Sequence, residues 1–207
     1  MTNRRTLLVF TAAASLLQVA GPLGRSACAQ GATDKASAFV KSTGDKLVNV
    51  VNGPQSDREK RAKLMQIIDN AVDVDGVARF CLGRFWRNAS AEQQQRYTQL
   101  FHQVLANNIT AKLGAYRGVR YTVGRAEQRE DDAVVSTVVE RPNNQPASVD
   151  WIISNPASGP KIIDVVAAGT SLRLTQREDY ASFLNSHSSN INALIDAMHQ
   201  QVAQAGG

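Results

Sequence analysis

The spacing of apolar residues changes twice along this chain, and these two changes constrain the fold more than any other feature. From about residue 34 to residue 116, apolar residues recur at three- and four-residue steps, which predicts amphipathic helices. Between residues 119 and 169 the period shortens to two, and Val, Ile, Tyr and Trp become frequent, which predicts strands. The tail, from about residue 180 to residue 198, returns to helical spacing. Helices, then strands, then helices predict one α+β domain.

Four helices are expected before the strands. The second and the fourth begin at capping boxes, in which Ser56 precedes Glu59 and Ser90 precedes Gln93 by three positions. A short helix over 76–88 lies between them, and the fourth helix is expected to continue until just before the glycine that precedes the first strand. The first helix ends at a Gly-Pro pair, and its apolar stripe consists of Ala36, Phe39, Val40, Leu47, Val50 and Val51.

Four strands are expected at 119–126, 132–140, 147–154 and 160–169. The turns between them are short, and connections of this length join antiparallel neighbours, so the strands should form a four-stranded meander. Alternation gives each strand two faces. One face is expected to carry Val135, Thr137 and Val139, and another Val149, Trp151 and Ile153.

The N-terminus predicts export. Arg4 and Arg5 precede an apolar run over 6–20, which is shorter than the roughly 20 residues of a membrane-spanning helix. Ala27 and Ala29 form the small-x-small pattern of a signal peptidase site. We therefore expect residues 1–29 to be a secretory signal peptide and residues 30–207 to form a single mature domain. A twin-arginine signal and a retained anchor stay open as alternatives. Lipidation of Cys28 is disfavoured, because Arg25 stands where a lipobox requires leucine.

The mature composition argues against two classes of protein. The signal peptide contains three arginines and no acid, so its removal lowers the formal net charge from +5 to +2, which does not favour a nucleic-acid binder. Only Cys81 remains after cleavage, so the mature chain contains no internal disulfide. Its neighbours Phe80, Leu82 and Phe85 predict a free, buried thiol.

No catalytic or metal-binding pattern is present in the sequence. His102, His187 and His199 are scattered on expected helices, and Ser171 lacks the glycines of a nucleophile elbow. The DVDG motif at 73–76 lacks the first and last ligands of a calcium loop. We therefore expect no catalytic residue, no metal and no cofactor.

Two sequence blocks together resemble a known family. The first is LGRFWR at 82–87, followed by SAEQ at 90–93. The second spans 164–172, with Asp164-Val165, Gly169 and Ser171-Leu172, and continues into an arginine-to-tyrosine helix start at 177–180. In this order, and behind a signal peptide, they resemble the MlaC, or toluene-tolerance, family over about residues 34–200, including its hopanoid-associated HpnM branch. This chain departs from the family pattern at two places. Lys161 stands where the family often has Trp, and the HSSN segment at 187–190 stands where a Gly is common.

The resemblance implies a fold, a cargo and partners. The fold would be an NTF2-like cone of curved sheet and helices around an apolar cavity. The function would be a monomeric periplasmic carrier that moves phospholipid, or a hopanoid, between the outer and inner membranes. Its partners would be an outer-membrane lipoprotein complex and an inner-membrane ABC transporter with a periplasmic substrate-binding component, and no nucleic acid. The alternatives are an NTF2-like enzyme that uses Asp150 or Asp164 as general base, or an adaptor protein with a filled core.

Two sets of side chains can be assigned places on the expected fold. Phe80, Phe85 and Trp86 are expected to pack in the core at a helix junction, with Arg84 and Arg87 as surface or headgroup-side charges. Inward positions of the long helix and the sheet are predicted to touch lipid tails, although alternation alone allows them to be ordinary core residues. These are Leu105, Ile109, Leu113, Tyr116, Val135, Val139, Val149, Trp151, Ile153, Val165 and Val166.

Overall fold

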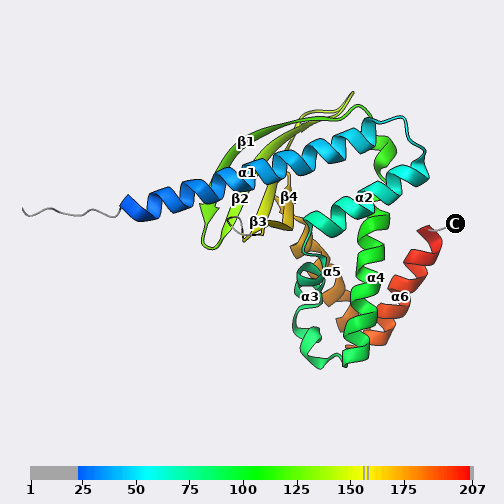
Figure 1. The fold of residues 1–207 in the computed structure, drawn as a ribbon. Helices are drawn as coiled ribbons and strands as arrows, with labels where there is room; N and C mark the ends of the chain where they lie inside the picture. The colour runs from blue at the N-terminus through cyan, green and yellow to red at the C-terminus, as the bar shows by residue number, and fades with distance from the viewer. Residues whose placement is uncertain (1–22, 156, 158, 206–207) are drawn as a thin grey trace, which may run out of the picture.

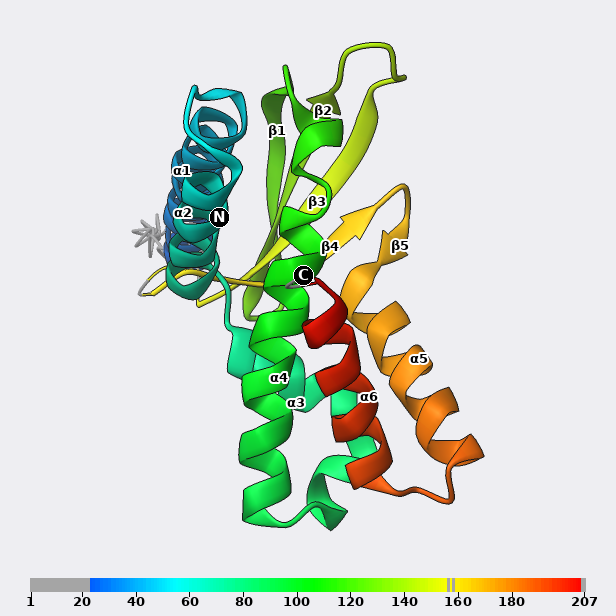
Figure 2. The same cartoon turned by 90° about the vertical axis from the view of Figure 1, so that its right-hand side faces the viewer.

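The structure, a computed structural model, describes residues 23–155, 157 and 159–205. Most of the predicted signal peptide lies outside these residues. The described part combines six α-helices with one antiparallel sheet, which confirms the α+β class (Figure 1). A long N-terminal helix and the helix after it run beside the sheet, and the four later helices form a block at one end of it (Figure 2). None of the helices described is both long enough and apolar enough to span a membrane.

Helices α1 (Leu23–Asn52) and α2 (Asp57–Ala71) lie side by side (Figures 1 and 2). The predicted capping box begins α2, because Ser56 accepts from the backbone of Glu59 and the Glu59 side chain accepts from Ser56. Lys60 then donates to the carbonyl of Val51 at 2.9 Å and so joins the end of α1 to the start of α2.

The expected helix over 76–88 is divided in two. Helix α3 (Val74–Leu82) begins earlier, because Asp73 caps it by accepting from the backbone of Gly76. The helix stops at Gly83, whose φ of +56° lies in the left-handed region that favours glycine. A 3₁₀ helix, η1 (Gly83–Asn88), then carries the second half of the LGRFWR block.

Helix α4 (Ala91–Thr110) starts at the predicted Ser90–Gln93 capping box but ends earlier than expected. A separate 3₁₀ turn, η2 (Leu113–Tyr116), follows it. The Thr110 hydroxyl donates to the carbonyl of Asn107, which competes with the helical ladder at its last turn. The apolar spacing alone did not reveal this break.

The sheet contains the four expected strands and a short fifth one, in the order β1 to β5 with every pair antiparallel. Val135 lies opposite Trp151, and Thr137 opposite Val149. The two apolar series expected on separate faces therefore share one face. The strands are β1 (Arg120–Arg129), β2 (Asp132–Glu140), β3 (Ala147–Ser154), β4 (Lys161–Ala167) and β5 (Thr170–Ser171).

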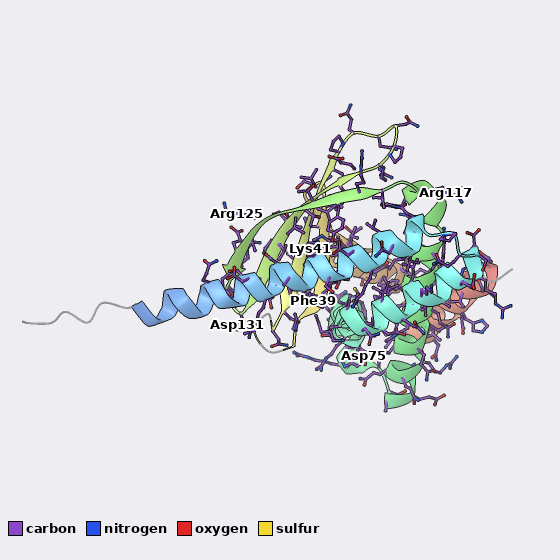
Figure 3. The ribbon with its side chains drawn as sticks, turned by 45° about the horizontal axis from the view of Figure 1, so that its top comes forward. Phe39, Lys41, Asp75, Arg117, Arg125 and Asp131 are labelled. Atoms are coloured by element: carbon purple, nitrogen blue, oxygen red, sulfur yellow. The ribbon has the colours of Figure 1, made fainter. Side chains whose placement is uncertain are left out.

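Helix α1 packs on this same face, at the side of β1 and β2 (Figure 3, with Phe39 and Lys41 on the helix). The approach is close at Gly44, where a Cβ atom would lie 2.5 Å from the Tyr121 ring. The Tyr121 hydroxyl donates to Asp45 at 2.8 Å. We call the buried cluster between the sheet and the first two helices the sheet core; it comprises Ala36, Val40, Ala71, Ala133, Val135, Ile153 and Ile162.

A second cluster, the helical core, joins α3, η1 and α4 to α5 (Leu172–Ser186) and α6 (Ile191–Ala205). Tyr97 is fully buried at its centre, and its hydroxyl donates to the carbonyl of Ala78 at 2.9 Å. Its ring lies 6.0 to 6.4 Å from those of Trp86, Phe101 and Tyr180. The helical tail that the sequence predicts is thus confirmed, and it consists of two helices.

Cys81 is a free, buried thiol in the helical core, as predicted. Burial raises its pKa to about 12, and Sγ lies 3.5 Å from the carbonyl oxygen of Arg173. Near pH 8 its thiolate fraction should be roughly a thousandfold below that of an exposed cysteine. We expect a bulky thiol reagent to label the native protein correspondingly slowly and the urea-unfolded protein rapidly. Equal rates in both states would contradict this placement.

Candidate functional site

The shared face of the sheet is only partly covered. Helix α1 contacts chiefly β1 and β2, and it has few contacts with β3 and β4. Apolar side chains near this uncovered part remain half-buried, in contrast to the fully buried residues of the sheet core. We call this half-buried set the inner sheet patch; it comprises Val139, Val149, Trp151 and Val165.

Trp151 presents its ring to the patch while its polar atom is satisfied internally. Its indole Nε1 donates to Thr137 Oγ1 at 3.0 Å. The buried Thr137 hydroxyl in turn donates to the carbonyl of Val149 at 3.0 Å. The indole therefore needs no further polar partner, and its half-buried ring can contact hydrocarbon.

Not all the residues predicted to touch lipid share this patch. Val135 and Ile153 lie in the sheet core with no exposed surface, so they contact only protein. Val166 lies on the opposite face from Val165, because neighbours in a strand point in opposite directions, and it pairs with Asp150.

The helical candidates are also dispersed. Leu105 packs against the helical core. Ile109 is 37% exposed and Tyr116 is 36% exposed, with the Arg141 guanidinium 5.0 Å from the Tyr116 ring centroid. The side chain of Leu113 lies outside the described part of the structure. The structure thus brings four of the eleven candidates together on one surface.

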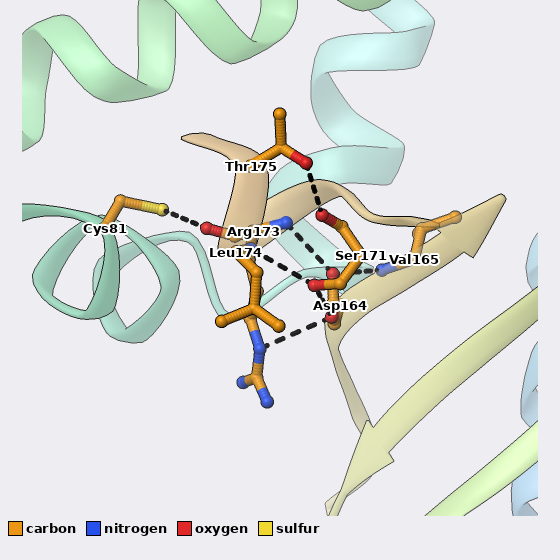
Figure 4. Close-up of polar contacts among 7 residues, drawn as sticks. All are labelled: Cys81, Asp164, Val165, Ser171, Arg173, Leu174 and Thr175. Carbon is orange, nitrogen blue, oxygen red and sulfur yellow. Dashed lines mark hydrogen bonds and ion pairs between the residues drawn. The ribbon is translucent and has the colours of Figure 1, made fainter. Parts of the chain in front are cut away.

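Asp164, a candidate general base, is instead held in a structural network (Figure 4). Its carboxylate accepts from the backbone of Val165 at 2.8 Å, from the backbone of Arg173 at 3.1 Å and from the Ser171 hydroxyl at 2.6 Å. Arg173 Nε lies 3.5 Å away and adds charge attraction without a hydrogen bond. Ser171 also caps α5 by accepting from Leu174. This network joins the end of the sheet to the start of α5 and leaves the buried carboxylate little access to a substrate.

The histidines show no catalytic arrangement. His102 Nε2 lies 3.0 Å from Asp75, and its Nδ1 lies 3.8 Å from Asp69, both at the helix surface. His187 stacks on Phe183 with ring centroids 4.0 Å apart. Among the residues that the structure describes, no group of three or more His, Cys, Asp or Glu side chains could hold a metal ion.

The two family-like sequence blocks meet in space at Gly83 and Arg177, and Phe80 and Arg173, which lie just outside the blocks, extend this contact. The guanidinium carbons of Arg173 and Arg177, from α5, lie 4.5 and 4.9 Å from the ring centroid of Phe80, from α3. A Cβ atom at Gly83 would lie 3.1 Å from Arg177 Nε, so a glycine leaves room for the arginine there. These contacts give a physical reason for the presence of both blocks in one fold.

A groove of about 630 Å³ opens beside this meeting point. Phe85 is buried in the helical core, as predicted, whereas Phe80 and Trp86 are half-buried and also line the groove. We call this hollow the arginine groove; its lining is Arg79, Phe80, Gly83, Arg84, Trp86, Arg87, Asn88 and Arg177.

Sequence reasoning did not identify the groove as a site, although the arginines interleaved with aromatics at 79–87 were its visible signal. A second hollow of about 440 Å³ lies at the turn between α1 and α2. None of the eleven candidate lipid contacts lines either hollow.

The fold and the patch together define a structural class of proteins. Its members have a curved antiparallel sheet that is flanked by helices and has an incompletely covered apolar face. Comparison with known families identifies the family within this class: the model of the MlaC protein family matches residues 41–200. The chain belongs to the MlaC family.

Two relatives support this assignment. The toluene tolerance protein ttg2D of Pseudomonas putida is 25% identical over 204 residues, covering 98% of this chain and 92% of the relative. A solved phospholipid-binding protein from Ralstonia solanacearum, in complex with a phospholipid, has a TM-score of 0.72 at 22% identity. That match covers 83% of this chain and 99% of the Ralstonia chain, and it shows that the two share a fold.

Proposed function

We propose that this protein is a periplasmic phospholipid carrier whose inner sheet patch contacts the acyl tails. The observation that carries the proposal is the half-buried apolar surface around Trp151, on a fold shared with a protein solved in complex with a phospholipid. Exposing acyl chains to water costs about 0.8 kcal/mol per CH₂, so two tails cost on the order of 20 kcal/mol. An apolar protein surface that replaces the bilayer around the tails removes most of this barrier.

A carrier of this kind needs no catalytic group. The buried Asp164 supports this reading, because three hydrogen-bond donors already occupy its carboxylate. Transfer between a membrane and an apolar protein surface is nearly neutral in free energy, so the direction of transport must come from partners. We propose that these are an outer-membrane lipoprotein complex and an inner-membrane ABC transporter with a periplasmic component.

Export by a signal peptide over 1–29 completes the proposal. Where burial is described, the first buried residues of α1 are Ala32 and Thr33, just beyond the proposed cleavage after Ala29. Cleavage there would keep Ala32 and Thr33 in the mature chain. We expect the mature protein to begin at Gln30 when it is purified from the periplasm. N-terminal sequencing that finds Met1, or an acylated Cys28, would contradict this expectation.

The carrier function is tested by the lipid content of the protein. The mature protein, purified without detergent, should release phospholipid on extraction with organic solvent, at about one molecule per chain by mass spectrometry. An unrelated periplasmic protein purified in parallel sets the background. If the extract contains a hopanoid instead of a phospholipid, the cargo of the carrier is a hopanoid. If the protein carries no lipid and also fails to take up lipid from vesicles, the proposal is wrong.

A further inference from the structure

The arginine groove has a concentrated positive charge that the chain itself does not neutralise. Four arginines line it, and no carboxylate does. None of the four takes part in an ion pair described for this structure. Arg84 donates to Asn185 Oδ1 at 2.6 Å, which is a neutral acceptor. Arg173, the nearby fifth arginine, differs because it faces Asp164.

Aromatic rings, rather than acids, hold three of these four guanidinium groups. Arg84 Cζ lies 4.8 Å from the ring centroid of Phe85, Arg79 Cζ lies 5.8 Å from that of Trp86, and Arg177 Cζ lies 4.9 Å from that of Phe80. A guanidinium placed over a ring can keep N–H groups available to an anion. Because the rings restrict the arginines beforehand, less conformational entropy is lost when a ligand binds.

The size and walls of the groove indicate the ligand. Arginine forks match phosphate oxygens in geometry and charge. A volume of about 630 Å³ is in the range of small-molecule sites and exceeds the needs of a bare phosphate ion. Phe80 and Trp86 add apolar walls, and tryptophan is enriched where proteins meet the headgroup region of a bilayer.

We propose that the arginine groove binds the phosphate of an anionic phospholipid headgroup at a membrane surface. The groove is built from α3, η1 and α5, whereas the inner sheet patch lies on β2, β3 and β4. It is therefore a second site, which docks the protein on a membrane separately from the contacts that hold the tails. The proposal draws on the carrier function only for the source of the phosphate.

Vesicle binding by the mature protein tests this site. The probes are vesicles of phosphatidylglycerol mixed with phosphatidylcholine and vesicles of phosphatidylcholine alone. The groove variant combines Arg79→Gln, Arg84→Gln and Arg87→Gln. The control variant removes the same charge from exposed arginines elsewhere, by Arg58→Gln, Arg61→Gln and Arg120→Gln.

We expect the native protein to cosediment with the anionic vesicles only. The groove variant should bind them about a hundredfold more weakly, and the control variant should stay within threefold of native. Equal losses in both variants would overturn the site, because attraction would then follow net charge alone. Binding of soluble polyglutamate but not of vesicles would overturn the lipid assignment in favour of an acidic protein partner. If inorganic phosphate binds as tightly as the vesicles, the groove recognises free phosphate, and the assignment to a membrane headgroup is wrong.

Lipid extraction separates this proposal from the carrier function. The groove variant should retain the same tightly bound phospholipid as the native protein, because its substitutions lie outside the inner sheet patch. If no form of the protein contains lipid but the native form still binds anionic vesicles through the groove, the carrier function fails and the groove stands. If lipid is retained by every variant and native protein ignores anionic vesicles, the groove proposal fails alone.

Discussion

Ile153→Asp is expected to lower the free energy of unfolding by roughly 4 kcal/mol or more. The Ile153 side chain has no exposed surface and packs in the sheet core, between the strands and α1. A carboxylate at this position would have neither water nor a cationic partner. Urea unfolding, followed by circular dichroism, measures the loss; a variant with native stability would show that the position is accessible.

Val149→Asp is the matched comparison, because Val149 lies on the same strand and the same face as Ile153 but is half-buried. Its carboxylate can reach water, so we expect a stability loss of at most about 1.5 kcal/mol, together with a clear fall in bound lipid. If Val149→Asp unfolds as readily as Ile153→Asp, the inner sheet patch is ordinary core. If it stays folded and keeps its full lipid load, the patch does not contact the tails.

Asp164→Ala is expected to have the second large effect, a loss of about 3–5 kcal/mol. The substitution removes the acceptor for two backbone N–H groups and the Ser171 hydroxyl, and it leaves Arg173 without its buried counterion. Both the sheet end and the start of α5 should loosen, since this carboxylate joins them. Thermal unfolding is the measurement.

The control is Asp150→Ala, on the neighbouring strand and half-buried on the same face of the sheet. The described structure shows no hydrogen bond to its side chain, so the loss should stay below about 1 kcal/mol. Equal destabilisation by both substitutions would contradict the special role assigned to Asp164. An Asp164→Ala protein with native stability would contradict the network itself.

The order of elements could be predicted from sequence because its signals are local. Both capping boxes lie within four residues of chain, and the change from helical to strand spacing is visible without tertiary contacts. The early end of α4 was missed because helical apolar spacing continues past it, through Leu113 and Tyr116 of the separate turn η2. The left-handed turn at Gly83 was also missed, although a glycine after a short helix is a local signal for such a turn.

The candidate site was predicted only in part, because it depends on strand register and on long-range contacts. Alternation shows that Val165 and Val166 face opposite ways but not which of them faces α1. Ile153 and Val149 share a face, and the position of the first two helices decides that one is buried and the other is not. The arginine groove was hidden because Arg177 joins it from a helix far along the chain.

The two tryptophans allow the most direct test of the central claim, that acyl tails contact the inner sheet patch. Trp151 lies in the patch, and Trp86 lies at the arginine groove. Trp86→Phe leaves Trp151 as the only tryptophan, and Trp151→Phe leaves Trp86, so excitation at 295 nm reports one indole at a time. Each variant would be loaded with phospholipid brominated along its acyl chains, which quenches tryptophan on contact. We predict strong quenching of Trp151 and little quenching of Trp86; unquenched Trp151 in a lipid-loaded protein would contradict the account.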